Sequence, residues 1–157
     1  MTMPKICDHT SVGMLIWNDD KLLLVERSKF PFGFAPPAGH MDGDASYEES
    51  AKREVEEEVG LKVENLELLV EGRKENKCRR EDGSWHYWKI YKAETTGEVQ
   101  RSLDETKQAI WLSVDELKLL SQKTEEYLAG KISEEEWQKN PGLESVWYEW
   151  FKELKII

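Results

Sequence analysis

Residues 39–61, GHMDGDASYEESAKREVEEEVGL, specify one helix and both of its ends. Ser46 followed by Glu49 forms a capping box, which predicts that the helix begins just after the serine. Gly60 is typical of the residue past a helix C-terminus, because glycine adopts the left-handed conformation without strain. The stretch therefore predicts a helix bounded by Ser46 and Gly60.

The last turn of this helix carries three consecutive glutamates, Glu56, Glu57 and Glu58. The helix dipole is already negative at this end, so each carboxylate destabilises it by about 0.3 kcal/mol or more. Lys52 and Arg53 offer little relief, because a cation that precedes its i+4 acid is the weaker order. Local rules broken without local compensation indicate a functional site, and a divalent cation would compensate the charge.

Helix angles separate the charged side chains into two groups. At about 100° per residue the apolar side chains share one face, which comprises Tyr47, Ala51, Val55 and Val59. Along the edge of that face lie Glu54, Glu57 and Glu58, and the outward positions are Glu49, Lys52, Arg53 and Glu56. Carboxylates gathered along this edge suit Mg²⁺ or Mn²⁺. The alternative is a solvated acidic helix end that binds nothing.

The same stretch resembles the Nudix box, G-x5-E-x7-R-E-U-x-E-E-x-G-U, in which U is aliphatic. The matching residues are Gly39, Arg53, Glu54, Val55, Glu57, Glu58, Gly60 and Leu61. Ala45 is the departure, since it stands where the box has its first glutamate. Asp42 or Asp44 could take over, with a carboxylate that accepts N–H bonds at the helix N-terminus. The chain is thus identified as similar to the Nudix hydrolase family.

This resemblance implies an α/β fold, a Nudix-type α/β/α sandwich with a mixed sheet. It also implies a metal-dependent hydrolase that cleaves a diphosphate linkage in a nucleoside diphosphate derivative, by attack of water on phosphorus. Glu54, Glu57, Glu58 and the Gly39 carbonyl would hold Mg²⁺ or Mn²⁺, and Arg53 would orient the glutamates.

Three further residues are candidates, the first two on the same resemblance and the third on the aromatic residues before the box. Glu105 lies where relatives often carry a loop acid, so it or a box glutamate would accept the proton of water, unless it is a solvated loop residue. Arg27, at a strand end, resembles a position that contacts phosphate, or it is an ordinary strand-end charge. Phe34, like Phe30 and Phe32, would stack on a nucleobase or belong to the core.

Two other functions stay open. The only basic cluster comprises Arg73, Lys74, Lys77, Arg79 and Arg80. It flanks an expected hairpin turn at Asp82-Gly83 and fits an enzyme acting on RNA 5′ ends, or else a solvated loop. A net charge of −10 opposes RNA. Ala45 motivates the second alternative, a Nudix-fold ligand sensor without catalysis. A small nucleotide-type substrate is the expected partner, and the chain is expected to be a monomer or homodimer.

The composition limits the class of protein. The 157 residues suit a single domain, and the charge of −10 argues against broad binding to nucleic acid or anionic membranes. Only Cys7 and Cys78 occur, without a metal-type pairing, and Cys7-Asp8-His9 is a weak zinc signal. Lone cysteines are typical of reduced cytosolic thiols. No signal peptide or long apolar run is visible, so a cytoplasmic protein away from membranes is expected.

The remaining sequence predicts strands interleaved with helices. A hairpin joins residues 11–17 to 22–27, and the loop 28–38 leads into the box helix. Further strands are expected at 63–71, 85–93 and 110–112. A capping box of Ser113 with Glu116 then opens a helix through about residue 120.

The tail at about 124–157 is expected to be a helical extension. Ser133 begins a short helix, and Pro141 occupies a position typical of the first turn of another. An apolar stripe at helical spacing follows, formed by Leu143, Val146, Trp147, Trp150, Phe151 and Leu154. The stripe packs as core on the sandwich or forms a dimer interface.

Overall fold

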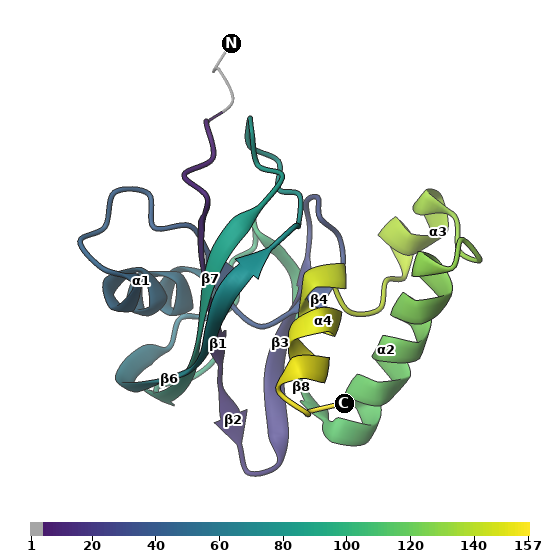
Figure 1. The fold of residues 1–157 in the computed structure, drawn as a ribbon. Coiled ribbons are helices and arrows are strands. Elements are labelled where there is room, and N and C mark those ends of the chain that lie inside the picture. The colour runs from purple at the N-terminus through teal and green to yellow at the C-terminus, as the bar shows by residue number, and fades with distance from the viewer. Residues whose placement is uncertain (1–4) are drawn as a thin grey trace.

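Two β-sheets lie between helix α1 and helices α2 to α4 (Figure 1). The computed structural model describes residues 5–157. Its strands are β1 Thr10–Leu15, β2 Trp17–Asn18, β3 Lys21–Arg27, β4 Phe34–Ala35, β5 Ala38–Gly39, β6 Lys62–Lys74, β7 His86–Thr96 and β8 Thr106–Ser113. Its helices are α1 Tyr47–Val59, α2 Val114–Leu128, α3 Glu134–Lys139 and α4 Ser145–Glu153. The expected α/β architecture with C-terminal helices is confirmed.

One sheet has the strand order β5-β1-β7-β6, and the other has the order β2-β3-β4 with β8 also paired to β3. Strands β1 and β7 run parallel, with Thr10 opposite Tyr87, whereas β6 and β7 are antiparallel. A parallel pair needs a long crossover connection, and α1 lies within it. The predicted mixed sheet is confirmed.

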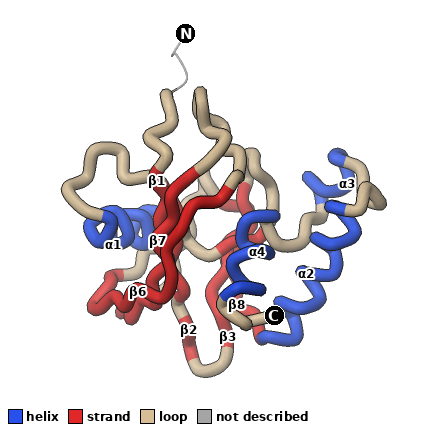
Figure 2. The backbone as a smooth tube through the Cα atoms, in the orientation of Figure 1, coloured by secondary structure: helices blue, strands red, loops and turns tan. Residues whose placement is uncertain are grey.

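The central strands are buried on both faces because helices cover both sides (Figure 2). In β1, Val12 and Met14 pack in the cluster that contains α1, whereas Leu15 packs with the C-terminal helices. In β3, Leu23 packs in the cluster with α1 and Leu24 packs with the C-terminal helices. Successive side chains of a strand point to opposite faces, so continuous apolar runs belong between two helical layers. This is the α/β/α sandwich.

The C-terminal stripe forms core. Trp147, Trp150 and Phe151 are each at most 1% exposed, and they pack in one cluster with Trp88 of β7. The rings of Trp88 and Trp147 meet edge to face with centroids 5.4 Å apart. Burial of each such side chain contributes about 1.5–3 kcal/mol to folding. The stripe's expected packing on the sandwich is therefore confirmed.

The helix starts predicted at Ser46, Ser113 and Ser133 are confirmed. Ser46 accepts the Glu49 N–H at the start of α1, although the Glu49 carboxylate turns to the Ala45 N–H and so completes no capping box. Ser113 and Glu116 form a full capping box at the start of α2. Gly60 ends α1 with φ of 71°. Serine side chains satisfy N–H groups that the first helical turn leaves free, which is why these signals work locally.

Two predictions on the chain's course were wrong. The expected loop 28–38 contains β4 and β5, which pair with β3 and β1. Pro141 does not open a helix, because residues 142–144 run beside β4, where Phe34 exchanges backbone hydrogen bonds with Gly142 and Glu144. Both features depend on pairing partners far away in the chain. No helix in the described residues has the length and apolar character needed to span a membrane.

Candidate functional site

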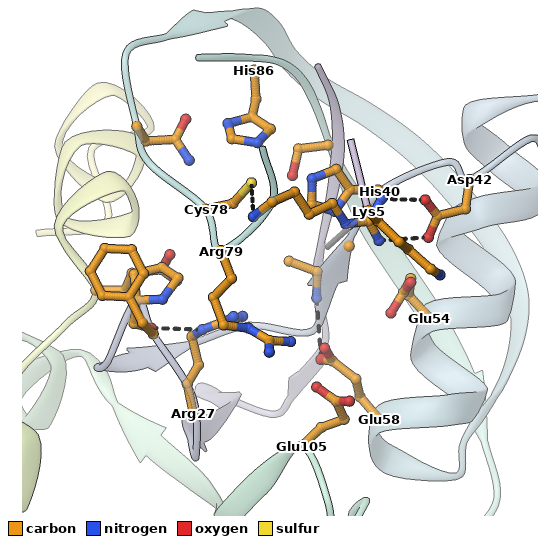
Figure 3. A pocket seen from close by; sticks show the side chains of 18 of the residues that line it. Lys5, Arg27, His40, Asp42, Glu54, Glu58, Cys78, Arg79, His86 and Glu105 are labelled. Atoms are coloured by element: carbon orange, nitrogen blue, oxygen red, sulfur yellow. Dashed lines mark hydrogen bonds and ion pairs between the residues drawn. The ribbon is translucent and has the colours of Figure 1, made fainter. Parts of the chain in front are cut away.

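A cavity of about 640 Å³ opens against the acidic side of α1 (Figure 3). The predicted site residues that line it are Arg27, Gly39, Arg53, Glu54, Glu57, Glu58 and Glu105. Phe34 does not line it, because β4 holds this residue against the C-terminal segment and its ring packs on the core. Phe30 lines the cavity instead and is 45% exposed.

Arg53 lies at the centre of the hydrogen bonds around these acids. Its Nη1 donates to Glu54 Oε1 at 2.8 Å and to Glu57 Oε2 at 3.1 Å. Its Nε donates to Asp44 Oδ2 at 2.9 Å, and its Nη2 to the His40 carbonyl at 2.9 Å. The angular prediction that Arg53 faces outward was wrong, because a long side chain can fold back along the helix toward a buried charge.

Glu58 is buried, Glu54 is partly buried with 12% of its side chain exposed, and Glu57 remains exposed. Burial raises the pKa of Glu54 to about 7 in spite of Arg53. Burial, and then the charge of Glu54, raises the pKa of Glu58 well above its ordinary value. The N–H of Ala38 donates to Glu58 Oε2 at 3.3 Å and offsets only part of this cost. The two carboxylates lie side by side, and the charges of Arg53 and Arg27 offset only part of the cost of ionising both.

A divalent cation fits this set of groups. Carboxylate oxygens are the ligands that Mg²⁺ and Mn²⁺ prefer, and a cation between Glu54 and Glu58 would reverse the electrostatic cost that raises both pKa values. Gly39 lies directly against Glu54, since a Cβ on residue 39 would come 2.2 Å from the carboxyl carbon. The backbone of β5 thus reaches the carboxylates only because this residue has no side chain.

Asp44 occupies the gap left by Ala45. Its Oδ2 accepts from Ser50 Oγ at 2.8 Å as well as from Arg53 Nε, and these hydrogen bonds lower its pKa. The contacts differ from the expected backbone N–H bonds, but they connect the loop before α1 to the helix. Asp42 has another partner, because both of its carboxylate oxygens bind the Arg80 guanidinium.

The basic cluster divides into two parts. Arg73 pairs with Glu75, and Lys74 pairs with Glu153, so both are engaged at the hairpin stem. Lys77, Arg79 and Arg80 line the cavity opposite α1. Figure 3 shows Arg79 reaching into the space between Cys78 and the carboxylates. The cavity thus has carboxylates on one side and guanidinium groups on the other, which suits a phosphate ligand held with a cation.

No sequence pattern indicated Glu144, a buried acid at the cavity wall that is 6% exposed. Burial raises its pKa, and Arg27 counteracts part of that rise. Arg27 also lowers the pKa of Glu58, and its Nε donates to the Pro31 carbonyl at 2.7 Å. The three-dimensional arrangement places Arg27 between two acids from distant segments, which no local pattern could indicate.

A second cavity of about 400 Å³ adjoins the first, since Phe30, Pro31, Asn76, Lys77 and Glu144 line both. Its other walls include aromatic side chains from the C-terminal region, namely Tyr127, Trp137 and Tyr148, together with Phe32. A polar, charged cavity therefore continues into a more aromatic one.

Comparisons with known proteins agree with this geometry. A family model described as NUDIX domain matches residues 8–135. A MutT NUDIX hydrolase from Burkholderia pseudomallei is 25% identical with a TM-score of 0.60, covering 68% of this chain and 84% of its own. A NUDIX hydrolase from Nitrosomonas europaea is 27% identical with a TM-score of 0.58, covering 82% and 91%.

A third solved structure extends the likeness in fold to the C-terminal helices. The MutT protein from Methanosarcina mazei has a TM-score of 0.67 and covers 98% of this chain and 96% of its own. At 18% identity this match concerns the fold alone.

Proposed function

Since the chain belongs to the NUDIX family and is a NUDIX pyrophosphohydrolase, we propose that it cleaves the diphosphate linkage of a small nucleoside diphosphate derivative. The observation that carries this proposal is that Glu54 and the buried Glu58 line one cavity together with Arg27 and Arg79. Carboxylates can hold a cation against a diphosphate, and guanidinium groups bind phosphate oxygens in two-pronged hydrogen bonds.

Glu54, Glu57, Glu58 and the Gly39 carbonyl would hold Mg²⁺ or Mn²⁺, which would offset charge on the phosphate oxygens and make the attacking water more acidic. Arg53 is a positioning residue, because it binds Glu54 and Glu57 while its other nitrogens bind Asp44 and the His40 carbonyl.

Hydrolysis needs a proton acceptor within reach of the attacking water. The oxygen of water forms a bond to phosphorus as the bridging P–O bond breaks, and the proton passes to a carboxylate. Glu105 is the proposed acceptor, since it lines the cavity beside Glu58 on a solvent-exposed loop (Figure 3). Glu105→Gln should lower kcat about 100-fold with little change in KM. A rise in KM at constant kcat would assign Glu105 to binding.

Phe30 is the proposed contact for the nucleoside. It replaces Phe34 in this role because it is exposed at the junction of the two cavities. Stacking of a base on an aromatic ring is worth about 1–3 kcal/mol. Phe30→Ala should therefore raise KM for a nucleotide substrate about ten-fold while leaving hydrolysis of a substrate without a base unchanged.

A panel of nucleotides, nucleotide sugars and dinucleoside diphosphates, assayed with Mg²⁺ or Mn²⁺, tests the proposed substrate class. A 5′-triphosphorylated oligonucleotide in the same panel tests the RNA alternative, which Lys77 and Arg79 at the cavity favour. Turnover of a small substrate in preference to the oligonucleotide is expected, because the net charge of −10 opposes an RNA backbone. The reverse preference would replace the proposed substrate.

A further inference from the structure

Both cysteines of the chain and two of its three histidines meet at one point beside the cavity. The four residues are Cys7, His40, Cys78 and His86. One ligand atom from each lies within 4.8 Å of the others. They come from four separate segments, which are the chain before β1, the loop after β5, the loop 75–85 and the start of β7.

The distances between these ligand atoms match a tetrahedral metal site. With Zn–S near 2.3 Å and Zn–N near 2.0–2.1 Å, a tetrahedron places sulfur and nitrogen about 3.6 Å apart. Cys7 Sγ lies 3.5 Å from His40 Nε2 and 3.3 Å from His86 Nε2. Both rings therefore present the same nitrogen toward the sulfur, as two ligands of one ion would.

A backbone N–H group donates to each of the two sulfurs, although burial still raises the pKa of the Cys7 thiol to about 11. The His9 N–H donates to Cys7 Sγ at 3.3 Å, and the Arg80 N–H donates to Cys78 Sγ at 3.4 Å. In each case the donor is two residues after the cysteine, and hydrogen bonds to the charged form favour it. Gly83 permits the second turn, since a Cβ there would come 2.2 Å from Cys78 Sγ.

Hydrogen bonds alone explain this cluster less well than a bound metal ion does. A thiol carries one proton, so Cys7 can donate to only one of the two imidazoles that face it. A disulfide between Cys7 and Cys78 would not explain why the rings of His40 and His86 both face the Cys7 sulfur.

We propose that Cys7, His40, Cys78 and His86 bind one Zn²⁺ ion in a closed tetrahedral site. Two sulfur and two imidazole ligands select zinc over the hard cations expected at Glu54 and Glu58, so the two metal sites differ in chemistry. Four protein ligands leave no open position, and the site is therefore structural.

The zinc site would hold the cavity's basic wall in place. Without metal, the tip of the loop 75–85 is joined to the rest by Cys7 N–H to the Glu81 carbonyl at 2.8 Å, Glu81 N–H to the Lys5 carbonyl at 3.1 Å, and the Arg80–Asp42 pair. Nearer the two ends of the loop, Trp88 Nε1 donates to Asn76 Oδ1 at 3.0 Å and His9 contacts Trp85. Arg79 follows Cys78 directly in this loop. On the other side of the cavity, His40 follows Gly39, which lies against Glu54. A zinc ion bound by both Cys78 and His40 would therefore link the basic wall to the carboxylate side.

The metal content of the untagged protein, purified without chelator from zinc-supplemented medium, tests this directly. About one zinc per chain is expected to survive dialysis, and Co²⁺ exchanged into the site should show visible absorption of a tetrahedral thiolate complex. A zinc-selective chelator should lower the melting temperature. Zinc absent from the dialysed wild-type protein, or octahedral Co²⁺, would overturn the proposal.

Two ligand variants and one matched control complete the test. Cys78→Ser and His86→Asn should reduce the zinc content from about one ion per chain to near none. His9→Asn should retain it, because this third histidine stacks on Trp85 and bonds the Trp85 carbonyl at 2.9 Å. Zinc content unchanged by Cys78→Ser, or an intact mass that shows a Cys7–Cys78 disulfide in the untreated protein, would contradict the site.

The fold of the variants can be checked independently of zinc. The Mg²⁺-induced rise in melting temperature depends on the carboxylates of α1, so a variant that keeps this rise is folded. If Cys78→Ser and His86→Asn lose zinc but keep the Mg²⁺ response, both residues are assigned as ligands of the site. The proposed substrate class can fail without affecting it, because none of these readouts uses turnover.

Discussion

Gly39 lies so close to Glu54 that a Cβ atom on residue 39 would come 2.2 Å from the carboxyl carbon and 2.3 Å from Oε1. The contact joins β5 to the acidic side of α1. Residue 39 also pairs with Val12 of β1, so the sheet holds its backbone in place. The backbone of residue 39 therefore has little freedom to move away, and the Glu54 carboxylate is the group that must give way to a larger side chain.

Gly39→Ala should lower kcat/KM about 100-fold, because the new methyl group displaces the Glu54 carboxylate by about 1 Å. Steady-state kinetics at saturating Mg²⁺ measures the loss. Gly72→Ala is the matched control, since a Cβ there would meet only the Trp150 ring at 3.8 Å. Equal activity of the two variants would show that the position of Glu54 does not matter.

Mg²⁺ or Mn²⁺ should raise the melting temperature by mass action, because the folded chain binds the cation and the unfolded chain barely does. At about 100 times the dissociation constant, the rise amounts to roughly 5–10 °C. Glu57→Gln should remove most of that rise, and differential scanning calorimetry with and without cation measures it. A full metal response in Glu57→Gln would exclude this residue as a ligand.

Glu58→Gln should lower kcat/KM by about 100- to 1000-fold, as expected when a group that stabilises transition-state charge is removed. Glu56→Gln is the control within the same run of acids, because Glu56 is exposed and does not line the cavity. Its activity should stay within a few-fold of wild type. Equal losses in both variants would indicate a diffuse negative field in place of specific ligands.

Glu144→Gln should make stability less dependent on pH. Burial raises the pKa of Glu144 in the folded protein, so its contribution is fully present below the ordinary value near 4.5 and is lost as pH rises through the folded pKa. As the pH rises from 4 to 8, the free energy of unfolding of the variant should therefore increase relative to that of the wild type. Urea titrations at both values measure this. Glu149→Gln, an exposed change in the helix α4 that follows Glu144, should show no such gain.

Local interactions explain what was predictable. The ends of α1 follow from Ser46 and Gly60, whose hydrogen bonds and backbone conformation involve only neighbours in the chain. The placement of Glu54 and Glu58 on one side of α1, away from Glu56, follows from helix periodicity alone. The α/β/α sandwich was predicted from the family resemblance. That resemblance rests on the box, and the spacing of the box residues is set by the same helix.

Contacts between distant segments decided the rest. Arg53 folds back onto Asp44 and the His40 carbonyl, and β4 pairs with the segment before α4. Both contacts depend on groups that no local sequence pattern brings near.

The gathering of Cys7, His40, Cys78 and His86 is the clearest case. In the sequence, two lone cysteines lacked a metal-type spacing, and the prediction that they form no metal pairing followed from that. The parallel pairing of β1 with β7 aligns the chain before one strand with the start of the other, because both strands run the same way. Sequence alone determined which ligands the chain possesses, and tertiary structure decided that they meet, since only the sheet sets distances between residues so far apart in the chain.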